Sequence, residues 1–409
     1  MIKNNLIMTQ NKLKNFIINL ISIIFAVFLC LFVANFVFIK ISNQKSFPRS
    51  LSGSLPNILL VFHPDTYKNN NLKNYTAILG GSYAQGGGDA YLSGIYDYSV
   101  AHHLHKQDKK NYLNFARAGY GSISAVSNLI NMYRISNSSN FINDLNKPDS
   151  VIFFFNEGHV LDANFREFSL FSKQDSDIEK FVINRFNENL KINSFDKLTN
   201  NFPLLFFFTK FYYHIENLFK KIIHEPKKII FFITNSFKKL FGYTIVLQTP
   251  GDLKKGKNTF TNSVKNREDV KNIQPLQAAA PILTKEEILI SLNIFFESIK
   301  YMKKWGELDK IYIVYIPSPV TLYDWSDPIN YEVPGDSKIG TTTKEKNNIN
   351  NKFITDKISE FSTKNNIQFL NTTQHLYELA KSKKIHGPLD WSHLNYHGYK
   401  DISNYILNK

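Results

Sequence analysis

The sequence predicts an α/β fold, a three-layer sandwich with a parallel sheet at its centre. Residues 150–155 (SVIFFF) form a continuous apolar run, which is typical of a parallel strand buried on both faces. Residues 310–316 (KIYIVYI) are predicted to be another strand. Runs of this kind alternate along the chain with stretches of helical apolar spacing. Apolar residues make up 43% of the 409 residues and charged residues 20%, so the chain can bury a sizeable core and is not disordered throughout.

The chain begins with a predicted membrane anchor. Residues 16–39 (FIINLISIIFAVFLCLFVANFVFI) carry no charge, and at about 1.5 Å per residue this helix would cross a hydrocarbon core of about 30 Å. The run is longer than an ordinary signal-peptide core, so we interpret it as an uncleaved signal anchor with residues 1–15 as a cytoplasmic tail. A cleaved signal peptide is the alternative. Both readings place the rest of the chain outside the cytoplasm, at the cell membrane, and in the periplasm if the cell is Gram-negative.

The first half of the predicted core domain spans residues 73–164, after a polar tether over residues 40–72. Residues 75–79 (YTAIL) read as a short buried strand that runs into the glycine-rich turn 80–89 (GGSYAQGGGD). Such a turn between a strand and a helix is the usual setting of an exposed nucleophile or a phosphate cradle. Residues 112–115 are a second strand candidate, and a helical stretch follows through Tyr133.

The second half of the core domain, residues 284–409, continues the alternation of strands and helices. The predicted elements are a helix over 286–303, the strand 310–316, a helix over 353–364, a strand over 367–370, and helices over 373–382 and 397–407. Together the two halves comprise roughly 220 residues, a usual size for one α/β domain.

Residues 165–283 interrupt the alternation and are predicted to be a helical and loop insertion. The 201–246 segment is rich in Phe and Lys, and its first part places apolar residues on one helical face. Basic amphipathic helices can lie on an anionic membrane surface, while a helical subdomain packed on the core is the alternative. Residues 249–278 are polar and are expected to form a loop.

The charge and the cysteine content exclude several classes of function. The formal net charge is +15, but only six of the basic residues are Arg, the better residue for recognising phosphates and bases. We therefore expect no nucleic-acid partner. The single cysteine, Cys30, lies in the apolar N-terminal run, which excludes disulfides and cysteine-based zinc sites in the rest of the chain. No cofactor is expected.

The strongest chemical signal lies near the C-terminus, in the segment 390–399 (DWSHLNYHGY). An Asp three residues before a His can hold the imidazole in one tautomer and stabilise the imidazolium, as a general base requires. Asp390 and His393 fit these roles. The nucleophile would be Ser82 in the glycine-rich turn, whose own backbone N–H could also stabilise an oxyanion.

Taken in this order, the motifs resemble the SGNH/GDSL hydrolase superfamily. In that family a Ser follows the first strand, a Gly follows the second, an Asn follows the third, and an Asp-x-x-His precedes the last helix of a flavodoxin-like sandwich. The resemblance implies that Ser82, His393 and Asp390 are catalytic. It also implies that Gly119, in the segment 114–121 (NFARAGYG), contributes to the oxyanion hole.

The sequence departs from the family pattern at two positions. Gly81 stands where the family has the Asp of Gly-Asp-Ser, a residue that supports the turn and performs no chemistry. In the third block, 156–162 (NEGHVLD), His159 stands where the oxyanion Asn is expected. A neutral imidazole can donate one N–H, so we favour His159 as the third donor, with Asn156 as the alternative.

Other candidate sites have weaker support. His102, His103 and His105 cluster in a predicted helix without an acidic partner, so a solvated helix face is a better reading than a metal site. The glycines at 86–88 lack the Lys-Ser/Thr that a phosphate-binding loop requires. His63 and Asp65 fall in the tether. Asp89 could orient the glycine-rich turn and is left outside the triad.

These observations together predict a membrane-anchored serine esterase or O-acyltransferase. By resemblance to membrane-anchored, extracytoplasmic relatives, its substrate would be an acyl group, such as acetyl, on a cell-envelope carbohydrate. An interfacial lipase with a lipid substrate is a variant of this reading. A non-catalytic glycan-binding protein that retains the fold is the alternative.

Overall fold

The computed structural model describes parts of residues 18–38 and the ranges 73–138, 145–172, 177–191, 261–332 and 339–409, apart from a few single residues within them. The predicted anchor 16–39 is therefore only partly covered, and the tether and the 201–246 segment, with His63 and Asp65, lie outside the described residues. None of the helices described within these ranges is both long and apolar enough to span a membrane.

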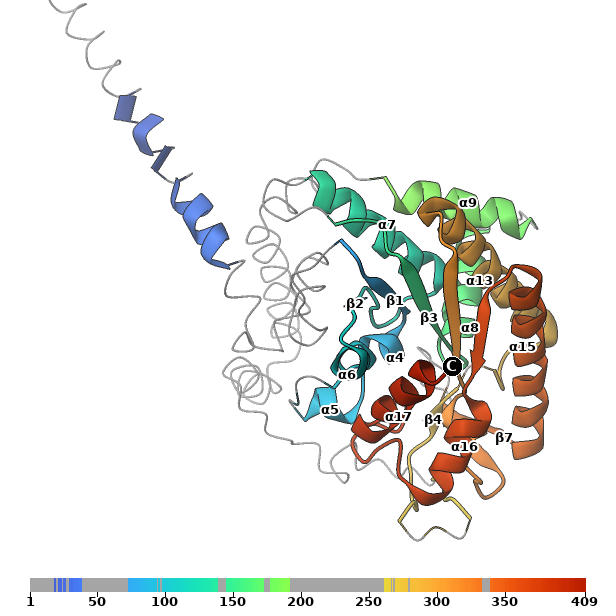
Figure 1. The fold of residues 1–409 in the computed structure, drawn as a ribbon. Helices are drawn as coiled ribbons and strands as arrows, with labels where there is room; N and C mark the ends of the chain where they lie inside the picture. Colours follow the sequence, from blue (N-terminus) through green and yellow to red (C-terminus); the bar gives the residue numbers. More distant parts are fainter. Residues whose placement is uncertain are drawn as a thin grey trace, which may run out of the picture.

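A five-stranded parallel sheet forms the centre of the fold, as predicted (Figure 1). Its strands are β1 (Thr76–Gly80), β2 (Tyr112–Asn114), β3 (Ser150–Asn156), β5 (Lys310–Ile316) and β8 (Gln368–Asn371). They lie in the order β2-β1-β3-β5-β8. Every residue of β3 after Ser150 is buried, which is why the unbroken apolar run SVIFFF indicated a central parallel strand.

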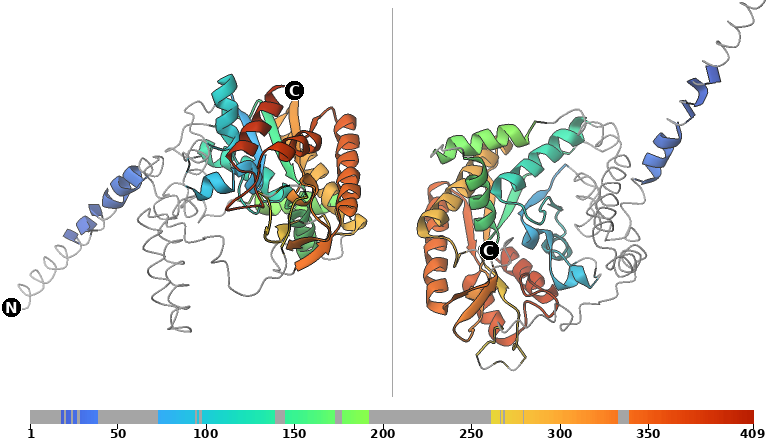
Figure 2. Two further views of the ribbon diagram at one scale, coloured as in Figure 1. Left: turned by 90° about the horizontal axis from the view of Figure 1, so that it is seen from below. Right: turned by 180° about the vertical axis from the view of Figure 1, so that it is seen from behind.

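Helices cover both faces of the sheet, and the two faces have separate apolar cores (Figures 1 and 2). Successive residues of β3 alternate between them, with Phe153 in one core and Phe154 in the other. One face carries α7 (Ser122–Ser138), α8 (Val160–Phe171), α9 (Ile178–Asn189), α13 (Lys285–Gly306) and α15 (Lys344–Lys364). The opposite face carries α4 (Ser82–Gln85), α5 (Asp89–Leu92), α6 (Val100–Asp108), α14 (Pro319–Leu322), α16 (Thr373–Ser382) and α17 (Tyr396–Leu407).

Parts of the predicted insertion 165–283 pack on the core. Helices α8 and α9 contact α13 and α7, and Phe186 of α9 stacks on Tyr301 of α13 with ring centroids 4.0 Å apart. Residues 261–278, expected to be a loop, instead carry β4 (Leu276–Gln277). This strand pairs with β6 (Ile329–Glu332), which also pairs with β7 (Ile339–Thr342), in a small second sheet.

Candidate active site

The carboxyl ends of β1 and β3 place the candidate site at one edge of the parallel sheet. Ser82 is the first residue of α4, directly after β1, and His159 is the N-cap of α8, shortly after β3. The acid–base pair comes from the loop before α17, at the far end of the chain. Ligand sites of open α/β sheets occupy this carboxyl edge, so the topology gathers residues that are distant in sequence.

Ser82, His393 and Asp390 form a hydrogen-bonded line. The Ser82 Oγ lies 2.7 Å from the His393 Nε2, and the His393 Nδ1 lies 2.6 Å from the Asp390 Oδ2. The other carboxylate oxygen of Asp390 accepts the backbone N–H of Ser392 at 2.8 Å. The structure therefore brings together the three residues that the sequence named as a triad, in the geometry that nucleophile activation requires.

The charges in this line are set by its surroundings. Burial raises the pKa of Asp390, but the hydrogen bond and the charge of His393 outweigh this effect and hold the pKa below its usual value. Asp390 is therefore ionised at neutral pH and can fix the Nδ1–H tautomer of His393, which leaves Nε2 free to accept a proton from Ser82.

Tyr83 contacts both His393 and the backbone of the loop that bears it. Its ring lies 5.0 Å from the ring of His393, and its hydroxyl donates to the backbone carbonyl of Ser392. Burial, then the negative charge of Asp390, raises the pKa of Tyr83 well above its usual value, so this hydroxyl remains a neutral donor. Tyr83 could not be singled out from the sequence, because a tyrosine after a nucleophile carries no motif of its own.

The loop that bears Gly119 is fixed against the nucleophile by two amide side chains. Asn114 donates to the Ala84 carbonyl at 2.8 Å and accepts the Ala116 N–H at 3.0 Å. Gln85 accepts the Ala118 N–H at 2.8 Å. Gly119 itself is exposed, and a Cβ built on it would meet no atom within 4 Å. A side chain at this position would therefore project into open space.

His159 stacks on His393, with ring centroids 5.7 Å apart and planes 13° apart. Its Nε2 is buried and has no hydrogen-bond partner. Burial, then the nearby His393, lowers the pKa of His159 to about 4, so the ring is neutral at physiological pH. A buried polar atom left without a partner costs about 1–3 kcal/mol, and the same is true of other buried atoms in the described residues, such as the Nε2 atoms of His103 and His386.

Asn156 is less suited to the oxyanion role. It is the last residue of β3 and is buried, and its Nδ2 donates to the backbone carbonyl of Ile316 at 3.4 Å. Its neighbour Glu157 binds the Ser318 N–H at 2.9 Å and so ties the loop before His159 to the loop after β5. Of the two candidate donors, His159 has the nitrogen without a partner.

Two of the three histidines in α6, His102 and His103, are buried. Helix α6 is present as predicted, but His102 and His103 are 6% and 5% exposed, so the expected solvated helix face is wrong for these two. The reason is that α17 packs on α6, and the ring of His103 meets Tyr396 edge-on at 5.1 Å. Within the described ranges no group of three His, Cys, Asp or Glu side chains could hold a metal ion.

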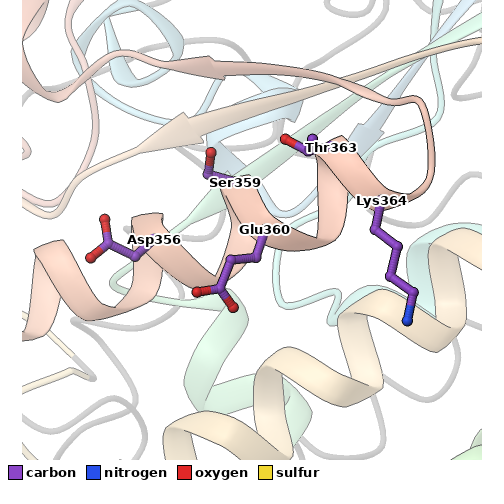
Figure 3. A pocket seen from close by; sticks show the side chains of 5 residues that line it. All are labelled: Asp356, Ser359, Glu360, Thr363 and Lys364. Atoms are coloured by element: carbon purple, nitrogen blue, oxygen red, sulfur yellow. The ribbon is translucent and has the colours of Figure 1, made fainter.

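A surface hollow of about 600 Å³ lies away from this site, along α15 (Figure 3). All its lining residues come from that one helix: Asp356, Ser359, Glu360, Thr363 and Lys364. Binding sites usually gather polar groups from several elements around an apolar cleft. We therefore read this hollow as the solvated outer face of α15.

His386 gives the protein a predictable loss of stability in acid. The residue is fully buried beside the site, 3.0 Å from the Tyr323 hydroxyl. Its pKa is lowered to about 3, first by burial, against the charge of Asp390. The folded protein therefore holds His386 neutral while the unfolded chain binds a proton below about pH 6.5. This contribution to stability is complete above that pH and is lost progressively as the pH falls toward 3.

We expect the wild-type free energy of unfolding to fall between pH 6.5 and 4.5 by about 2 kcal/mol more than that of His386→Asn, which has no imidazole to titrate. Urea unfolding of both proteins at the two pH values measures this difference. An equal fall in both would contradict the assignment.

No protein-family model matches this chain, and no curated protein matches it.

Proposed function

We propose that the protein is a serine-dependent acyl-transfer enzyme, an esterase or an O-acyltransferase. The observation that carries the proposal is the continuous line from Ser82 Oγ through His393 to Asp390, with contacts of 2.7 and 2.6 Å. Support also comes from the spatial order of the strands in the sheet, β2-β1-β3-β5-β8. In this order the first two strands of the chain are exchanged and the other three follow in sequence. That order is the flavodoxin-like one, which the resemblance to SGNH/GDSL hydrolases led us to expect.

The reaction would proceed in two halves through an acyl-enzyme. His393 Nε2 takes the hydroxyl proton of Ser82 as Oγ bonds to the ester carbonyl carbon. The bond from that carbon to the leaving alkoxide breaks, and His393 returns the proton to the alkoxide. Water or a sugar hydroxyl then gives its proton to His393 and attacks the acyl-enzyme, which releases Ser82 with its proton restored.

The negative oxygen of each tetrahedral intermediate would be held by three donors. These are the backbone N–H groups of Ser82 and Gly119 and the imidazole N–H of His159. The loops that bear Gly119 and His159 are anchored by Gln85 and Glu157. A hole held in place before the reaction lowers the barrier, because little reorganisation is then required as charge develops.

We further propose that the substrate is an acylated cell-envelope carbohydrate, with acetyl as the acyl group. The support is the resemblance to membrane-anchored SGNH proteins, the uncharged run 16–39, and the open space over Gly119. In this proposal residues 16–39 anchor the chain and the basic 201–246 segment contacts the anionic membrane surface. A lipid ester is the variant substrate, and a glycan bound without cleavage is the alternative function, favoured by the altered block at His159.

A fluorophosphonate probe tests the proposed nucleophile. We expect the full-length protein in detergent micelles to be labelled at Ser82, since the probe forms a stable adduct with a serine activated by a base. Ser82→Ala should not be labelled. The matched control is Ser93→Ala, which removes an exposed serine eleven residues further on and should label like wild type.

Two outcomes would contradict the proposal: the first argues against an enzyme, and the second argues against Ser82 as its nucleophile. One is a folded wild-type protein that neither reacts with the probe nor cleaves short acyl esters, which would favour the glycan-binding alternative. The other is labelling that persists in Ser82→Ala, which would place the reactive serine elsewhere.

A further inference from the structure

The nucleophile and its base come from opposite ends of the chain. Ser82 and His393 are 311 positions apart, yet their side chains meet at 2.7 Å. A misplacement of about 1 Å between reacting groups can cost about 100-fold in rate. Contacts between the turn after β1 and the loop before α17 must therefore hold these two groups in register.

Asp89 makes the most direct of these contacts. Its Oδ1 accepts the backbone N–H of Asp390 at 2.6 Å. The residue is 7% exposed. Burial raises the pKa of Asp89 above its usual value, although the hydrogen bond from the Asp390 N–H acts in the opposite direction. A buried carboxylate thus binds the main chain at the residue whose side chain orients His393.

The three glycines before Asp89 permit this approach. Gly88 has a φ of +119°, and a Cβ built on it would lie 2.5 Å from the backbone oxygen of Leu394. A Cβ on Gly87 would lie 3.1 Å from the His393 ring. The glycines at 87 and 88 therefore allow the two loops to touch at the site.

Two tyrosines secure the same contact. The hydroxyl of Tyr399, on α17, donates to the Gly87 carbonyl at 2.7 Å, and the hydroxyl of Tyr83 donates to the Ser392 carbonyl. Each bond joins the nucleophile turn to the acid–base loop or to the helix that follows it. Asp89 differs from the tyrosines because its partner is Asp390 itself.

We propose that Asp89 is a positioning residue that sets the register of Asp390 and His393 against Ser82 by holding the backbone N–H of Asp390. The inference rests on the proposed function and adds to it a residue outside the triad. Asp89 acts through Asp390, and its role depends on its acceptor oxygen and its length, while the negative charge is secondary.

Two substitutions separate geometry from charge. Asp89→Asn keeps the length and one acceptor oxygen but removes the charge, whereas Asp89→Glu keeps the charge but is one methylene longer. We expect Asp89→Asn to retain kcat for p-nitrophenyl acetate within about fivefold of wild type, and Asp89→Glu and Asp89→Ala to lose about 100-fold. The KM should change little in all three, because the residue does not contact substrate.

The control for general destabilisation is Glu167→Ala. Like Asp89, Glu167 is a carboxylate whose pKa is raised by burial, but it pairs with Arg185, on α9. We expect this variant to lose thermal stability without loss of kcat. Thermal melts of all variants show whether loss of kcat accompanies loss of fold.

The failures of the two proposals are distinguishable. If the wild-type protein cleaves no ester and binds no fluorophosphonate, the proposed function fails. If wild type is active and Asp89→Glu is equally active, or Asp89→Asn is as impaired as Asp89→Glu, the positioning role is overturned. The Asn and Glu variants decide the question even where Asp89→Ala does not fold.

Discussion

Alanine at either Ser82 or His393 is expected to lower kcat for a short acyl ester by about 10⁴- to 10⁶-fold, and alanine at both is expected to lower it hardly further. The reason is that the two side chains act as one unit. Without His393 the hydroxyl 2.7 Å away has no base to take its proton, and without Ser82 the base has no nucleophile to activate. The residual rate of each variant comes from substrate binding and the oxyanion hole.

Steady-state kinetics of the two single variants and the double variant measure this coupling. His397→Ala is the matched control, because His397 is an exposed histidine in the first turn of α17, four residues beyond His393. It should keep wild-type kcat. Losses that multiply in the double variant would mean that Ser82 and His393 work independently and would contradict the triad.

The central strands were predictable because burial on both faces leaves a simple signature. The run 310–316 matches β5 to the residue, and 150–155 matches β3 to within one residue at its end. The small second sheet left no such signature. The strand β4 is two residues long and pairs with residues 55 positions later, so no local pattern marks it as a strand.

Helix α15 shows that a helix with buried polar residues is hard to predict from the sequence. The sequence predicted a helix only from 353, whereas α15 begins at Lys344. The first two turns bury Asn350 and Asn351, which donate to the Ala280 carbonyl and the Tyr315 hydroxyl. Partners of this kind come from distant segments, and the apolar periodicity that marks a helix in the sequence is absent where they are used.

The residues of the candidate site also differ in how far the sequence could predict them. Ser82, Asp390 and His393 could be named from the sequence because each belongs to a short motif with a chemical reason for its spacing. The sequence suggested only that Asp89 orients its own turn. Its contact with Asp390 could not be predicted, since the two residues are 301 positions apart and an Asp after glycines is compatible with many turns. The signal that could have found it is the pairing of an unusual glycine run with a carboxylate at its end.

The second large loss of kcat that we expect comes from removing the imidazole of His159. His159→Ala should lower kcat by about 10²- to 10³-fold, the usual effect of losing one oxyanion donor. His159→Asn should remain within about tenfold of wild type, because the carboxamide also supplies an N–H at this position. His159→Phe preserves a ring against His393 without a donor, so it should be as impaired as His159→Ala. Kinetics of the three variants separate hydrogen bonding from ring stacking.

The low pKa of His159, about 4, is compatible with the neutral donor role that we propose for this histidine. Its ring stacks on His393 with centroids 5.7 Å apart, and His393 becomes an imidazolium during each half of the proposed reaction. A second positive charge at that distance would oppose this step, whereas a neutral donor does not. The ratio of wild-type to His159→Asn activity should therefore stay constant from pH 6 to pH 8. A ratio that changes severalfold over this range would show that His159 titrates and would remove it from the oxyanion hole.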